Sequence, residues 1–211
     1  MNQSDEMSEL QLAGLSKIAL VKADPDTRAF TLVGAFMGYF ALLEAGIDIA
    51  LGEVLELHGA SRAIVTRNMA FDDKIKTFRS LVDLFLSDRG EAKRFDELAR
   101  RARSYGEKRN VVAHTPFRAS PKSDGVEFLA ISATSTLKFP DVDWSIDEFL
   151  RQIDDINTID NALRSIKSKM SLERIARALA RPDSSKKLGG LFGLGAELLS
   201  GEAKPDPIGS A

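Results

Sequence analysis

The stretch from Glu107 to Phe117 reads EKRNVVAHTPF and gathers residue types that can act on a phosphodiester. Arginine grips a phosphate through two parallel hydrogen bonds, and histidine transfers protons near neutral pH. His114 is one of only 2 histidines in the chain. Arg109, Asn110 and His114 are therefore our candidate catalytic residues.

The same stretch is expected to end a helix. Pro116 disfavours helical geometry at the residue before it, so a helix that begins at Glu91 should end near His114. The carbonyl end of a helix would stabilise an imidazolium there. Asn110 and His114 share a face at i and i+4, with Arg109 beside them, so the three polar groups are expected to converge. A structural interpretation is also open, in which the arginine forms an ion pair, the asparagine bonds the backbone and the histidine caps the helix.

The string R-N-V-V-A-H at a helix end resembles the R-x-x-x-x-H motif of the HEPN superfamily, the higher eukaryotes and prokaryotes nucleotide-binding domains. An asparagine directly after the arginine is typical there. The segments FALLEAGIDIAL and FDDKIKTFRSLVDLF are similar to the helices that precede the motif in stand-alone bacterial members. The resemblance covers roughly Thr27 to Phe117.

The resemblance implies a helical bundle that, in many members, is a metal-independent endoribonuclease of toxin, defence or RNA-processing systems. Two protomers then bring both motifs into one cleft, with Arg109 and His114 as the catalytic pair and Asn110 orienting them. The implied partners are a second copy of the chain, RNA, and an antitoxin or other protein, with no cofactor. Other members are non-catalytic nucleotide- or protein-binding modules, and this alternative stays open. Members modified by partner nucleotidyltransferases carry a tyrosine two residues after the histidine, where this chain has Pro116.

Two carboxylates, Glu44 and Asp48, lie at i and i+4 on the most apolar expected helix. Like charges at this spacing are unfavourable unless a cation lies between them. Arg109 is the partner that we expect, which would make the two acids a support for the motif. Pairing with surface lysines, or a place at a protomer boundary, is equally open. A metal site with His114 would have too few good ligands, so we expect no metal.

A local excess of positive charge precedes the motif on the same expected helix. Such a cluster can hold an RNA backbone without reading its sequence. A solvated face balanced by neighbouring acids explains the same pattern. The cations that we assign to RNA binding are Arg101, Arg103 and Lys108.

The elements that must position these residues are mostly helical. Apolar residues recur at helical spacing in four segments, and a capping box at Ser145 and Glu148 opens a further helix. The expected helices run from Ser8 to Val21, from Thr27 to Gly59, from Asp72 or Asp73 to the SDRG segment, from Glu91 to His114, and over 145–180. Residues 124–140 alternate and are rich in β-branched and aromatic types, which predicts a small hairpin or extended insertion.

We therefore predict a mainly all-α bundle of about five helices. One HEPN-like domain should span 1–180, with its motif-bearing core at 27–117 and a disordered tail at 181–211. The chain has 211 residues, a net charge of -2 and no cysteine, which excludes disulfides and thiolate chemistry. The polar start lacks the pattern of a secretory signal, and charge interrupts the longest apolar run, so we expect a cytoplasmic protein without a membrane span.

Overall fold

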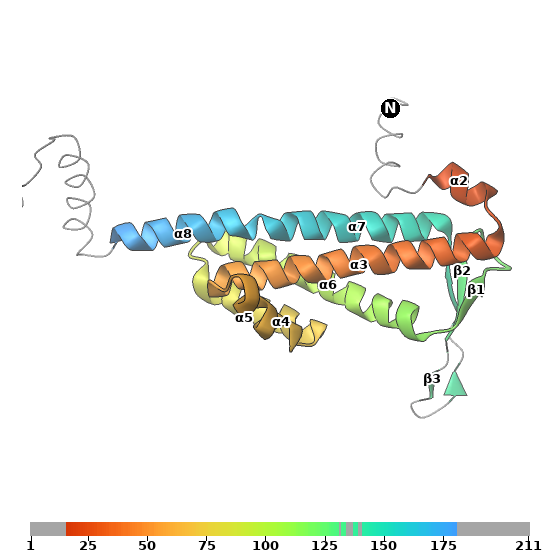
Figure 1. Ribbon diagram of the computed structural model, residues 1–211, viewed down its shortest axis with the longest axis horizontal. Coiled ribbons are helices and arrows are strands. Elements are labelled where there is room, and N and C mark those ends of the chain that lie inside the picture. The colour runs from red at the N-terminus through yellow and green to blue at the C-terminus, as the bar shows by residue number, and fades with distance from the viewer. Residues whose placement is uncertain (1–15, 131, 134–136, 139–140, 181–211) are drawn as a thin grey trace, which may run out of the picture. The chain divides into compact units, whose positions relative to one another are not determined.

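The computed structural model describes residues 16–130, 132–133, 137–138 and 141–180, and it confirms a mainly α-helical bundle with a small antiparallel sheet (Figure 1). The expected helix start at Ser8, parts of the 124–140 insertion and the 181–211 tail lie outside the described residues. The chain divides into two compact units, Met1–Met170 and Ser171–Ala211. The candidate site lies entirely within the first unit.

Helices supply most of the described chain. They are α2 (Lys17–Lys22), α3 (Pro25–Leu55), α4 (Gly59–Arg67), α5 (Phe71–Phe85), α6 (Arg89–His114), α7 (Ile146–Arg164) and α8 (Ile166–Ala180). The sequence predicted α3, α5 and α6 as helices, and α2 falls at the end of the helix predicted from Ser8 to Val21. The segment predicted as one helix over 145–180 is two helices, α7 and α8, and α4 was not predicted.

Helix α3 begins and ends at different residues from those that the sequence predicted. It begins at Pro25 rather than at Thr27, because the Asp24 side chain accepts the Thr27 N–H at 3.1 Å and proline suits the first helical position. It ends at Leu55, and the next residue, Glu56, has a left-handed φ of 58°. Gly59, expected to follow the end of α3, instead begins α4.

Helix α3 is the central element of the bundle. Figure 1 shows it alongside α7, with α6 crossing it, and it also packs against α5. Its buried positions include Leu32, Phe36, Leu43 and Ile47, each no more than 1% exposed. Among the described helices, α3 is the one long and apolar enough to cross a bilayer. This is weak evidence for a membrane span, because the core helix of a soluble protein passes the same test.

The helix pair α3 and α7 approaches closely at Gly46. A Cβ built there would overlap the Asp160 carboxylate, whose other oxygen accepts from Arg164 at 2.8 and 3.0 Å. Glycine is therefore required at this crossing because any side chain would push the two helices apart.

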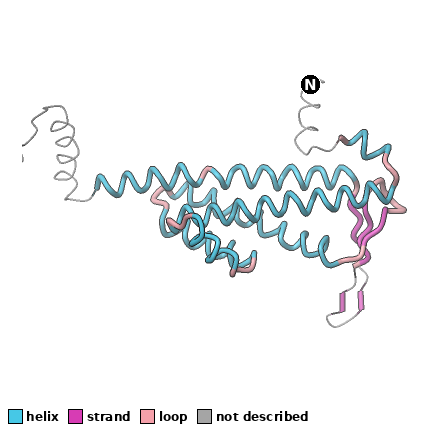
Figure 2. Tube along the Cα trace, viewed as in Figure 1, coloured by secondary structure: helices cyan, strands magenta, loops and turns pink. Residues whose placement is uncertain are grey.

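The strands follow α6 directly. They are β1 (Phe117–Ala119), β2 (Val126–Leu129) and β5 (Asp141–Trp144), in the antiparallel order β1-β2-β5, and a separate pair, β3 (Ser132–Ala133) and β4 (Leu137–Lys138) (Figure 2). Phe117 pairs with Phe128 and Val126 with Trp144. The predicted extended insertion is confirmed, but the sheet begins earlier than residue 124 and closes on a strand after residue 140.

An aromatic cluster joins the sheet to the helices. The ring of Trp144 lies 5.0 Å from Phe128, 5.3 Å from Phe149 and 5.7 Å from Phe36. Phe36 comes from α3 and Phe149 from α7, so one tryptophan contacts three elements. Such tilted and edge-to-face pairs add stabilisation beyond the area that they bury.

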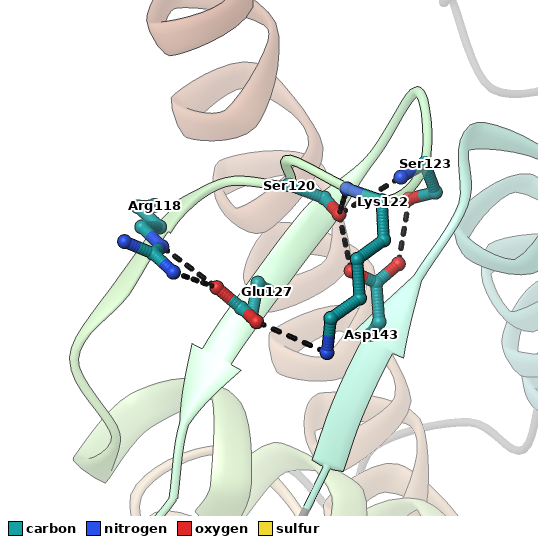
Figure 3. Close-up of polar contacts among 6 residues, drawn as sticks. All are labelled: Arg118, Ser120, Lys122, Ser123, Glu127 and Asp143. Atoms are coloured by element: carbon teal, nitrogen blue, oxygen red, sulfur yellow. Dashed lines mark hydrogen bonds and ion pairs between the residues drawn. The ribbon is translucent and has the colours of Figure 1, made fainter.

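The outer side of the sheet carries a polar network (Figure 3). Glu127, only 8% exposed, accepts from Arg118 Nε at 2.7 Å and lies 3.4 Å from Lys122 Nζ. Asp143 accepts the hydroxyls of Ser120 and Ser123, the latter at 2.6 Å. These bonds fix the loop between β1 and β2 against β5. We therefore interpret the network as structural.

Candidate functional site

The motif lies at the carboxyl end of α6, as predicted. The helix begins at Arg89, where the Asp88 side chain accepts the N–H groups of Gly90 and Glu91, and it ends at His114. Thr115 has extended geometry, with φ of -111° and ψ of 128°, which is the geometry favoured before a proline. His114 therefore sits in the last turn, with its side chain exposed to solvent.

A pocket of about 570 Å³ opens where α6 meets α3 and the start of α5. Its lining residues are Phe40, Glu44, Met69, Ala70, Phe71, Asp72, Arg103, Gly106, Glu107, Arg109 and Asn110. Phe40 and Phe71 form its apolar wall, with ring centroids 4.9 Å apart. A Cβ at Gly106 would lie 2.8 Å from the Phe71 ring, so this glycine lets the ring lie against α6.

Arg109 projects into this pocket without a carboxylate partner among the described residues. Its guanidinium lies 5.8 Å from the centroid of the Phe40 ring, and its Nη1 donates to Asn110 Oδ1 at 3.2 Å. Its Nε is buried and has no hydrogen-bond partner in the described part of the chain. A half-buried cation with an unused donor is suited to receive an anion.

The expected pairing of Glu44 and Asp48 with Arg109 is wrong. Lys74 Nζ lies 2.8 Å from Glu44 Oε1 and 2.8 Å from Asp48 Oδ1, and the lysine side chain is only 5% exposed. Burial acts to lower the pKa of Lys74, but the two carboxylates outweigh it and raise the pKa above its ordinary value. The acids thus belong to an ion cluster around the buried Lys74, between α3 and α5, and Glu44 also lines the pocket.

Sequence reasoning missed Lys74, although a signal was present. It lies on the same stripe of α5 as Phe71, Ile75 and Phe78, where apolar residues are expected. A lysine in an apolar stripe needs a buried carboxylate partner. The unexplained pair on α3 was such a partner.

His114 does not line the pocket that holds Arg109 and Asn110. Five residues along an α-helix correspond to a rotation of about 140°, so Arg109 and His114 leave α6 in different directions. The structure therefore brings the arginine and the asparagine together and places the histidine at the neighbouring helix end.

The candidate RNA-binding cations are largely engaged. Arg101 pairs with Asp155, and Arg103 Nε lies 2.6 Å from Asp72. Lys108 Nζ lies 4.7 Å from the centroid of the Tyr105 ring. The Tyr105 hydroxyl donates to Asp155 at 2.7 Å, and burial together with this carboxylate raises the pKa of Tyr105.

The arginines nearer the start of α6 are also paired with acids. Arg94 Nη1 lies 3.0 Å from Glu91, and Arg100 Nη2 lies 2.8 Å from Asp96. The alternative of a solvated face balanced by acids thus describes most of this helix. Among the described residues that line the pocket, Arg109 is the cation without a carboxylate partner, although Glu44, Asp72 and Glu107 also line it.

No protein-family profile, curated protein or solved structure matches the chain, so the resemblance to the HEPN superfamily remains a prediction.

Proposed function

We propose that the chain is a metal-independent endoribonuclease of HEPN type, acting on RNA at a cleft between two copies. The observation that carries the proposal is Arg109, a half-buried arginine that lines an open pocket with no carboxylate partner among the described residues. Such a side chain is prepared to bind a phosphate, because no internal ion pair has to break first.

The chemistry assigns one role to each residue. A histidine removes the proton from the ribose 2′-hydroxyl, and the 2′-oxygen then forms a bond to the adjacent phosphorus. The bond from phosphorus to the 5′-oxygen breaks, and that oxygen receives a proton, which leaves a 2′,3′-cyclic phosphate and a 5′-hydroxyl. Arg109 stabilises the charge that accumulates on the phosphate, Asn110 positions the guanidinium, and His114 transfers protons.

Two copies supply what one chain lacks. A single His114 would have to act as base and acid in the same step, whereas two symmetric copies provide one histidine for each role. Because Arg109 and His114 diverge around α6, a second copy also allows the arginine of one chain to work beside the histidine of the other.

A non-catalytic module that binds a nucleotide or a protein is the second candidate. The observation that favours it is that His114 lies outside the pocket lined by Arg109 and Asn110. In that case the pocket would bind an anionic group without acting on it.

Cleavage in the presence of EDTA distinguishes the two candidates. We expect the protein to cut unstructured RNA in EDTA, to spare DNA, and to lose about a hundredfold or more of its rate in His114→Ala, which removes the proton transfer. His58→Ala is the matched control, because His58 is also exposed and its side chain makes no capping bond.

Either of two results would reject the enzyme. One is a folded His114→Ala protein that cuts as fast as wild type, and the other is a wild-type protein that binds RNA without cutting it. The second result would establish the binding module.

We further propose a cytoplasmic role in a toxin or defence system, with an antitoxin or another protein as regulator. The absence of cysteine fits a reducing compartment. Co-purification of the chain with the product of a neighbouring gene would test the regulator.

A further inference from the structure

One face of α3 is apolar and uncovered. Phe30 is 68% exposed and Leu42 is 55% exposed, although both are large apolar residues on the central helix. Between them Gly34 and Gly38 are exposed, and a Cβ built at either position has no atom of the described residues within 4 Å. We call Phe30, Thr31, Gly34, Gly38, Ala41 and Leu42 the α3 face; all six are exposed and none is charged.

The sizes of these residues mirror each other about the level of Phe36, which points the opposite way and is buried. Phe30 and Leu42 lie six residues before and after this level, and the two glycines lie two residues before and after it. A two-fold contact requires this kind of symmetry, because the same surface must fit itself. A bilayer or an unrelated protein does not require it.

We propose that the α3 face binds the α3 face of a second copy in antiparallel orientation, about a two-fold axis at the level of Phe36. In this register Phe30 meets Ala41 of the second copy, and Leu42 meets its Thr31, within about 1.5 Å of the same height. Large residues thus meet small ones, and the glycines at the centre allow the two backbones to approach closely. A parallel pair would instead place Phe30 against Phe30.

The same arrangement brings the two motifs together. The Phe30 ring lies 5.1 Å from the Phe117 ring, and the Arg109 guanidinium lies 5.8 Å from the Phe40 ring. The segment 109–117 therefore follows one flank of α3, on both sides of the level of Phe36. An antiparallel two-fold axis keeps this flank on the same side in both copies, so both segments border one cleft at the axis. A parallel pair would put them on opposite sides.

The role of this cleft in RNA cleavage rests on the proposed function, whereas the interface rests on the α3 face alone. Cross-linking of the full-length chain tests the interface without any activity measurement. The chain contains no cysteine, so wild type is a silent control. We choose Thr31→Cys and Ala41→Cys, because both side chains are exposed on the face.

In the proposed register residue 31 of one copy lies level with residue 41 of the other, whereas two copies of the same residue lie about 15 Å apart along the axis. We expect a disulfide-linked dimer when the two variants are mixed under mild oxidation, and little from either variant alone. Strong cross-linking of Thr31→Cys by itself would overturn the antiparallel register.

Sedimentation of a charged variant provides the second arm. Gly38→Lys should weaken the dimer at least tenfold, because it places a charge at the closest approach, while its Cβ would contact none of the residues that the structure describes. Ala63→Lys, an exposed position on α4, is the matched control and should leave the dimer unchanged.

A wild-type chain that is monomeric at tens of micromolar, a concentration above the dissociation constants of ordinary dimers, would overturn the proposal. That result is expected if another protein or a bilayer covers the face. A dimer that cross-links as described but cuts no RNA would reject the proposed function and leave the interface standing.

Discussion

Two cations, Lys74 on α5 and Arg109 on α6, approach the same flank of α3 and differ in what surrounds their charge. Lys74 is buried between Glu44 and Asp48 at 2.8 Å from each, whereas in the described part of the chain Arg109 contacts the amide of Asn110 and the ring of Phe40. The charge of Lys74 is used up within the fold. No carboxylate of the described residues pairs with Arg109, which faces a pocket. We therefore interpret Lys74 as a structural cation and propose Arg109 as a binding one.

Removing the structural cation should have the largest effect on the molecule. Lys74→Met leaves two acids, 34% and 23% exposed, side by side without their cation. Breaking a fully buried ion pair costs about 3–5 kcal/mol of unfolding free energy, and the partial hydration of the acids lowers the expected loss to about 2–3 kcal/mol. Urea unfolding followed by circular dichroism measures it. Lys76→Met on the same helix is the control, since the Lys76 side chain is 59% exposed and its pair with Asp72 contributes at most about 1 kcal/mol.

The comparison fails if the two lysine variants unfold at the same urea concentration. A triple variant, Lys74→Met with Glu44→Gln and Asp48→Asn, tests whether the lost stability comes from the two unpaired acids. Because the acids then carry no charge, we expect this protein to recover part of the lost stability.

Removing the binding cation should change activity rather than stability. Arg109→Ala should lower RNA cleavage about a hundredfold, since donors aimed at a developing oxyanion contribute on this scale. Its unfolding free energy should fall by no more than about 1 kcal/mol, the contribution of one contact between a cation and a ring. Arg67→Ala, an exposed arginine at the end of α4, serves as the control.

Loss of stability in Arg109→Ala as great as in Lys74→Met would show that the arginine is structural as well. Arg109→Lys separates the effect of the charge from that of the guanidinium geometry. A lysine keeps the charge but lacks the planar fork of donors, so cleavage should remain well below that of wild type.

Giving the binding cation a carboxylate partner should have a smaller effect. Asn110 Oδ1 already accepts from Arg109 at 3.2 Å, so Asn110→Asp places a negative charge where the amide oxygen lies. We expect about a tenfold weaker affinity for RNA, equivalent to about 1.4 kcal/mol. Fluorescence anisotropy measures the affinity, and Asn110→Ala separates loss of the amide from gain of the charge. Equal affinity in wild type and Asn110→Asp would contradict an available Arg109.

The smallest effect should appear in alkaline solution. The pKa of Lys74 is raised in the folded protein, so the folded chain keeps a proton that the unfolded chain loses. Its stabilisation is complete below the ordinary value of 10.5 and is lost as the pH rises through the folded value. Tyr105, whose pKa is also raised, adds a loss of the same sign. Unfolding free energies above pH 10.5 should decline less steeply in Lys74→Met than in wild type, and parallel slopes would contradict this.

Local signals in the sequence predicted most of the fold. Pro116 predicted the end of α6, and Ser145 with Glu148 predicted the start of α7, where the Ser145 hydroxyl accepts the Glu148 N–H at 3.2 Å. Helix α4 was not predicted because its segment, GASRAIVTR, begins with a glycine and buries little beyond Thr66. No apolar stripe was present to reveal it.

Partners distant in the chain could not be predicted. Lys74 pairs across 30 residues with Glu44, and the choice between this lysine and Arg109 depends on how α5 and α6 pack on α3. Sequence spacing placed Arg109, Asn110 and His114 on one helix end, but their directions depend on rotation about the helix axis. The order β1-β2-β5 likewise depends on contacts between strands that a helical motif does not encode.

The aromatic cluster provides the molecule with an optical reporter. Trp144 is the only tryptophan, so fluorescence excited at its red edge comes from the junction of β5 with α3 and α7 and from nowhere else. Far-ultraviolet circular dichroism, in contrast, reads the helices. Coincident melting curves from the two signals would show that the small sheet and the bundle unfold as one cooperative unit. A fluorescence change that comes first would mean that the strands detach from the helices while the bundle is still folded, and that the loop after His114 opens with them.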